Sequence, residues 1–120
     1  MDERTTISDL KLRVQKFCED RDWDQFHNAK DLAIGIITES SELLEHFRFK
    51  SKEEMEGYFV DGHKREEISE ELADVLFFVL RFAQMFNIDI TQELIKKIEK
   101  NNQRYPVEKC KGANKKYSEL

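Results

Sequence analysis

The composition of this 120-residue chain favours one helical, globular domain over residues 1–120. Charged residues make up 38% and hydrophobic residues 39%, with four glycines and one proline, which argues against a disordered or β-rich chain. The longest apolar runs, residues 32–37 and 75–80, are too short to cross a bilayer, and the N-terminal residues lack the apolar core of a secretion signal. We therefore expect an all-α cytoplasmic protein with no membrane partner and with its two cysteines reduced.

Two helices are predicted in the first half of the chain. Residues 7–21 repeat apolar side chains at helical spacing, and residues 31–49 place theirs on one broad arc. Between them, residues 21–28 are polar, carry two aromatic side chains and have no helical stripe, which predicts a loop. From the residues alone, Trp23 and Phe26 are better explained as plugs over the end of a helix bundle than as a ligand pocket.

Two further helices are predicted in the second half. Residues 51–63 are interpreted as a connector with one short helical turn, followed by the longest helix, residues 66–86. A fourth helix is expected over residues 89–101, and Pro106 is expected to end helical structure. The four helices predict a four-helix-bundle-like fold. Because the long helix is apolar almost all round, it also predicts an oligomer.

Charge is distributed unevenly along the chain. The net charge is −5, but residues 96–116 hold eight Lys or Arg side chains against two Glu. A basic tail from about residue 103 is most simply a solvated segment. Contact with phosphate groups or with nucleic acid is the alternative that composition leaves open.

Two pairs of carboxylates border the predicted core. Glu71 falls inside the apolar stripe of the long helix with Asp74 one turn on, and Glu39 and Glu42 repeat this spacing on the second helix. If the two helices pack antiparallel, the four acids converge, which is unfavourable unless a cation neutralises them. Oxygen ligands suit Mg²⁺ or Mn²⁺, and Mg²⁺ commonly bridges to a polyphosphate. His46 lies near the same direction and is interpreted as a core-edge or solvent-facing histidine rather than a ligand.

These acids also carry a resemblance to a known family. The segments ESSE (39–42) and ELAD (71–74) resemble the ExxE…ExxD signature of the all-α nucleoside triphosphate pyrophosphohydrolases, the MazG-like group. The segments RDWDQFH (21–27), FRFK (47–50) and NNQRYPV (101–107), with Lys111-Gly112, resemble its dCTP pyrophosphatase branch. The resemblance spans nearly the whole chain.

The resemblance implies a hydrolase that cleaves a nucleoside triphosphate between the α and β phosphates and works as a tetramer built from dimers. It implies that Glu39, Glu42, Glu71 and Asp74 bind Mg²⁺ and that one of them orients the attacking water. It also implies contacts to the substrate. The residues that would enclose the base are Trp23, Asp24, Gln25, Phe26, His27 and Phe49. Phe78 would also lie at the substrate, and the phosphates would be contacted by Lys97, Asn101 and Arg104.

Three positions depart from that branch. Phe49 replaces an expected tryptophan, Phe78 an expected tyrosine and Val14 an expected histidine. The first change keeps stacking, whereas the other two remove polar contacts. The expected substrate is therefore dCTP or a modified pyrimidine triphosphate, removed as nucleotide-pool house-cleaning.

Two other functions fit the sequence less well. A carboxylate-bridged dimetal bundle for redox or storage chemistry normally uses Glu-x-x-His pairs, and the predicted site has none. A non-enzymatic binding bundle that uses the basic tail leaves Glu71 unexplained, and the acidity of the chain argues against a nucleic-acid partner.

Overall fold

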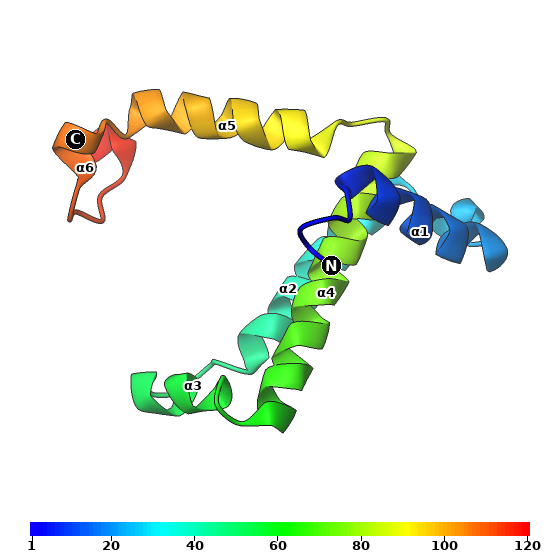
Figure 1. Ribbon diagram of the computed structural model, residues 1–120, viewed down its shortest axis with the longest axis horizontal. Coiled ribbons are helices and arrows are strands. Elements are labelled where there is room, and N and C mark those ends of the chain that lie inside the picture. The colour runs from blue at the N-terminus through cyan, green and yellow to red at the C-terminus, as the bar shows by residue number, and fades with distance from the viewer. The chain divides into compact units, whose positions relative to one another are not determined.

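The computed structural model describes residues 1–120, and every regular element in it is a helix (Figure 1), which confirms the predicted all-α class. The chain forms two compact units, Met1–Asn87 and Ile88–Leu120, each described here by itself. The elements are α1 (Ile7–Asp20), η1 (Asp24–Phe26), α2 (Ala29–Glu45), α3 (Lys52–Tyr58), α4 (Gly62–Met85), α5 (Ile90–Arg104), α6 (Val107–Cys110) and η2 (Tyr117–Glu119), where η marks a 3-10 helix.

The start of α1 is fixed by a reciprocal capping pair. The Thr6 hydroxyl accepts a hydrogen bond from the Asp9 N–H at 3.1 Å, and the Asp9 carboxylate accepts one from the Thr6 N–H at 3.0 Å. After α1, the Trp23 N–H returns to the carbonyl of Cys18 at 3.0 Å. The loop predicted over residues 21–28 is therefore wrong in part, because it contains the short helix η1.

The second helix is shifted toward the N-terminus relative to its prediction. Asn28 caps α2 by accepting from the Asp31 N–H at 2.9 Å, and α2 ends at Glu45 rather than at Phe49. Residues 46–49 continue as hydrogen-bonded turns, and Phe49 has φ 63°, in the left-handed region. The predicted short turn is confirmed as α3, where Ser51 accepts from the Glu54 N–H at 3.1 Å.

The long helix α4 forms the axis of the first unit. It begins at Gly62, earlier than predicted, because the Asp61 carboxylate caps it through the His63 N–H. Helix α2 packs along α4 in the antiparallel direction, and α1 and α3 also contact α4 (Figure 1). The buried apolar residues are Cys18 of α1, Leu32 of α2, and Ile68, Leu80 and Ala83 of α4. Leu72, although it is an apolar residue of α4, is 59% exposed.

The second unit contains α5 and the C-terminal segment. Asp89 caps α5 through the Gln92 N–H at 3.0 Å, and α5 continues beyond its predicted end to Arg104. Pro106 does not end helical structure, since α6 and η2 follow it; proline is well tolerated just before a helix. No helix of the chain combines the length and the apolar character needed to span a membrane.

Candidate active site

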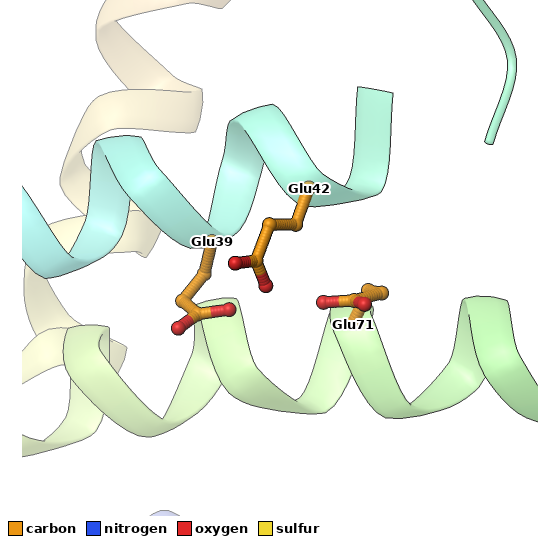
Figure 2. Close-up of side chains that lie close together, drawn as sticks. All are labelled: Glu39, Glu42 and Glu71. Carbon is orange, nitrogen blue, oxygen red and sulfur yellow. The ribbon is translucent and has the colours of Figure 1, made fainter. Parts of the chain in front are cut away.

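Three carboxylates from α2 and α4 converge in the first unit. Glu39 and Glu42 are one turn apart on α2, and Glu71 faces them from α4 (Figure 2). One carboxylate oxygen from each residue lies within 4.8 Å of the other two. The antiparallel packing of α2 on α4 therefore brings together acids that are separated by about thirty residues in the sequence.

Two oxygen atoms of this cluster are buried without a partner. Glu39 Oε2 and Glu71 Oε2 accept no hydrogen bond, and they are the only such buried side-chain atoms in the chain. Partial burial raises the pKa of Glu39 to about 7, and the neighbouring carboxyl groups of Glu42, Asp74 and Glu71 add to this shift. Burial also raises the pKa of Glu71, with Glu42 and Asp74 contributing. Unsatisfied, closely spaced oxygens are the environment that a hard cation neutralises, so these residues fit Mg²⁺ or Mn²⁺.

Asp74 and His46 border the cluster without belonging to it. Asp74 is exposed and lies outside the group of three, yet its charge acts on both Glu39 and Glu71. His46 is half-buried, and its Nε2 is 3.9 Å from Glu71 Oε1. This confirms the core-edge position expected for His46, whose positive form would favour the charged form of Glu71.

The raised pKa of Glu39 predicts that the metal-free protein loses stability as pH rises. Between its ordinary value of 4.5 and about 7, Glu39 keeps a proton in the folded state that it releases in the unfolded state. Stability therefore falls across this window and levels off above it. Thermal denaturation in excess chelator at about pH 5 and about pH 8 measures the effect. Glu39→Gln should flatten the slope; equal slopes for the variant and the wild type would contradict the prediction.

The aromatic segment after α1 lies against the same helical unit. The Trp23 ring is 38% exposed and packs edge-on against the rings of Phe17, at 5.5 Å, and His27, at 6.3 Å. Phe26 is exposed, and the Gln25 amide donates to the backbone and side chain of Asp22. Trp23 is thus partly a packing residue, as the plug interpretation expects, with one part of its ring open to solvent.

Arg81 also belongs to this region, although the sequence pattern did not single it out. It is the one buried charged side chain, and its guanidinium binds Asp24, His27 and Gln84. Asp24 and His27, both expected near the base, therefore direct polar atoms toward α4. An arginine within the apolar run of α4 was the available signal, because such a residue is rarely buried without partners.

The two other aromatic candidates have different environments. Phe49 is 90% exposed in its left-handed conformation, with the Arg48 guanidinium 4.7 Å from its ring centroid. Phe78 is half-buried and lies directly on Gly35 of α2, where a Cβ atom would come within 2.5 Å of the Phe78 ring. The structure thus gives Phe78 a packing role between α2 and α4 in addition to its expected role at the substrate.

The three expected phosphate contacts belong to the second unit. Lys97, Asn101 and Arg104 occur on α5 at spacings that put them on one face of the helix. The Arg104 guanidinium lies 4.7 Å from the ring centroid of Tyr117. The part that these three residues play in the site stays a prediction.

Comparison with known proteins gives consistent relatives. Residues 34–120 match the MazG-like family. The chain is 35% identical to dCTP pyrophosphatase 1 of Mus musculus over 115 residues, which cover 96% of this chain and 68% of that protein. Identity to dCTP pyrophosphatase 1 of Homo sapiens is 30% with the same coverage. The crystal structure of a pyrophosphatase from Archaeoglobus fulgidus superposes with a TM-score of 0.74 and 33% identity, covering 83% of this chain and 92% of that one.

Proposed function

This chain belongs to the MazG-like family and is a nucleoside triphosphate pyrophosphatase, and from this premise we propose its metal, its substrate and its assembly. The proposed reaction is Mg²⁺-dependent hydrolysis of dCTP or a modified pyrimidine triphosphate between the α and β phosphates. The products are the nucleoside monophosphate and pyrophosphate. The proposed role is the removal of such nucleotides from the cellular pool.

The main support for the proposed cation is a pair of buried carboxylate oxygens on facing helices that have no hydrogen-bond partner. Glu39 Oε2 from α2 and Glu71 Oε2 from α4 are buried without partners, next to a third carboxylate from Glu42. A purely structural acid cluster would be expected to find hydrogen-bond donors or to remain solvated. This arrangement instead supports a cation site, and oxygen-only ligands favour a hard cation over zinc.

We assign the cation to Glu39, Glu42, Glu71 and Asp74. A bound Mg²⁺ would neutralise the cluster and help to stabilise the negative charge that develops on the phosphates. The chain itself contributes acceptor oxygens, one of which would hold the attacking water and accept its proton.

For the base, we propose the segment Trp23–His27 together with Phe49. The exposed part of the Trp23 ring and the exposed Phe49 ring are both available for stacking. The departures at Val14 and Phe78 remove polar groups, so we propose that these two positions give the base no hydrogen bond. A Trp23→Ala variant with an unchanged KM would contradict this assignment.

For the phosphates, we propose Lys97, Asn101 and Arg104 of α5. The positively charged side chains of Lys97 and Arg104 and the amide of Asn101 lie on one face of α5. They match the negative charge and the hydrogen-bond acceptors of a polyphosphate. An Arg104→Gln variant that binds the substrate as tightly as wild type would count against this role.

Pyrophosphate release tests the reaction directly. We expect turnover on pyrimidine triphosphates with Mg²⁺, weaker turnover on purine triphosphates, and none in excess chelator, because the clustered carboxylates repel the substrate until a cation neutralises them. Added Mg²⁺ should restore activity, and Mn²⁺ should substitute for it. Full activity in chelator would overturn the metal assignment, whereas metal-dependent release from every triphosphate alike would overturn the base preference.

We also propose a homotetramer, assembled as a dimer of dimers, in the cytoplasm. Large apolar side chains are exposed on three helices: Ile37 and Leu44 on α2, Leu72 on α4, and Leu94, Ile95 and Ile98 on α5. Such surfaces on a small chain favour burial against further copies. The free thiols of Cys18 and Cys110 are consistent with a reducing compartment. A monomeric mass by light scattering at micromolar concentration, or recovery of the protein in an exported fraction, would contradict these assignments.

A further inference from the structure

The buried guanidinium of Arg81 has a full set of hydrogen-bond partners, and Arg81 itself has no role in the proposed reaction. Arg81 is 1% exposed, and a buried charge of this kind is costly unless it is paired and hydrogen-bonded. Its Nη2 donates to the Asp24 carboxylate, its Nη1 to Gln84 Oε1 at 2.6 Å and its Nε to His27 Nδ1 at 3.0 Å. Two of these acceptors lie in the segment 23–27, so Arg81 ties that segment to α4.

The bond to His27 determines where the histidine proton is. Arginine stays protonated and its Nε–H can only donate, so His27 Nδ1 must be an acceptor with a free lone pair. A charged imidazolium has protons on both nitrogens and cannot accept this bond. His27 is therefore the neutral imidazole with its proton on Nε2. Burial and the adjacent Arg81 cation lower the pKa of His27, which agrees with the neutral form.

The remaining proton of His27 is available to a ligand. Nε2 has no hydrogen bond to another residue of the chain, and it is not among the buried unpaired side-chain atoms, which belong only to Glu39 and Glu71. The His27 ring is half-buried and lies edge-on to the Trp23 ring. The Nε2–H group of His27 is thus a hydrogen-bond donor next to the partly exposed ring of Trp23.

We propose that Arg81 is a positioning residue that fixes the segment 23–27 and holds His27 in the Nε2–H form, so that His27 donates a hydrogen bond to an oxygen or ring-nitrogen acceptor of the nucleotide. The identity of the ligand rests on the proposed function. The tautomer and its dependence on Arg81 do not, since they follow from contacts within the chain. A side chain that only filled space at position 81 would leave the tautomer of His27 unconstrained.

Nitrogen NMR of the full chain with labelled histidines tests the tautomer without any substrate. The chain has three histidines, and the signals of His27 are identified by their loss in His27→Gln. We expect Nδ1 unprotonated and Nε2 protonated at about pH 7 and still at about pH 6, where an ordinary histidine is largely charged. A proton on Nδ1, or on both nitrogens at about pH 7, would overturn the proposal whether or not the protein hydrolyses nucleotides.

Arg81→Lys tests the role of the guanidinium, with Arg65→Lys as the matched control on an exposed turn of α4. A lysine ammonium cannot reproduce the planar fork, so His27 should exchange between tautomers and KM should rise about five- to tenfold, as for one lost hydrogen bond, with kcat within about twofold. The control should change neither quantity. If a folded Arg81→Lys variant kept the His27 spectrum of the wild type, the positioning role of Arg81 would be overturned. If the spectrum changed but KM did not, the role of His27 as a hydrogen-bond donor to the nucleotide would be overturned.

A titration of the wild type with dCMP, the expected product, covers the case in which Arg81→Lys does not fold. Binding should shift the His27 Nε2–H signal more than the signals of His46 and His63. A shift elsewhere in the spectrum with His27 unmoved would overturn the donor role. If dCMP does not bind at all, the base assignment and the donor role fail together, while the free-protein spectrum still decides the tautomer.

Discussion

Glu71→Gln is expected to remove most of the activity while leaving the metal-free protein at least as stable as the wild type. The amide keeps the shape of the side chain but deletes a charge that burial and neighbouring carboxylates already disfavour, as the raised pKa of Glu71 indicates. It also deletes a ligand of the proposed cation. We expect turnover to fall by a factor on the order of 10² or more, as when one preorganised electrostatic contact is removed. Pyrophosphate release, Mg²⁺ titration and thermal denaturation in chelator measure the three quantities.

Glu70→Gln is the matched control for this change. Glu70 precedes Glu71 on α4 but is exposed, lines an open hollow with His63, Glu66 and Glu67, and is not one of the three clustered acids. The same chemical change there should alter neither turnover nor Mg²⁺ affinity. A stable Glu71→Gln variant with turnover near that of the control would remove the basis of the proposed metal site.

The features that could be predicted from sequence are those fixed by local spacing. Helix geometry gives the one-turn spacing of Glu39 and Glu42 and places Glu71 inside an apolar stripe. Antiparallel packing of the two helices then suffices to bring these acids together. The start of α3 at Ser51 was likewise predictable, because a capping side chain bonds to a backbone group three residues away.

The features that were missed depend on contacts between distant segments. The contacts of Arg81 with Asp24 and His27 join residues 57 and 54 positions apart, and no local pattern specifies such partners. The predicted end of α2 is too late because the aromatic residues Phe47 and Phe49 extend the apolar pattern, whereas the chain leaves the α-helix after Glu45 and continues in hydrogen-bonded turns. A weaker signal was present at Gly35, since a glycine inside a helix is unfavourable and usually has a packing reason.

Gly35→Ala is expected to destabilise the protein and to impair catalysis from a distance. Glycine to alanine in a helix normally gains about 1 kcal/mol of helix propensity. Here the new Cβ would lie 2.5 to 2.8 Å from three atoms of the Phe78 ring, closer than van der Waals contact allows. Overpacking of this kind costs about 1–3 kcal/mol, so it should outweigh the gain and lower the melting temperature. Glu39 follows Gly35 by one turn on α2, so a shift of α2 that relieves the clash would also move the carboxylate cluster. A displacement of about 1 Å there can cost up to about 10² in turnover.

Gly57→Ala supplies the control, because Gly57 is also helical but has nothing within 4 Å of the position of a new Cβ. That variant should be slightly more stable than the wild type, by up to about 1 kcal/mol. A second substitution, Phe78→Leu, should restore part of the stability lost in Gly35→Ala, because the smaller side chain relieves the clash with the new Cβ. In the wild-type background there is no clash to relieve, so the same substitution should be destabilising. The coupling free energy from this double-mutant cycle separates the contact from general loss of packing. If the Gly35→Ala variant melts at or above the wild-type temperature with normal turnover, the close approach of α2 and α4 at Phe78 does not position the carboxylates.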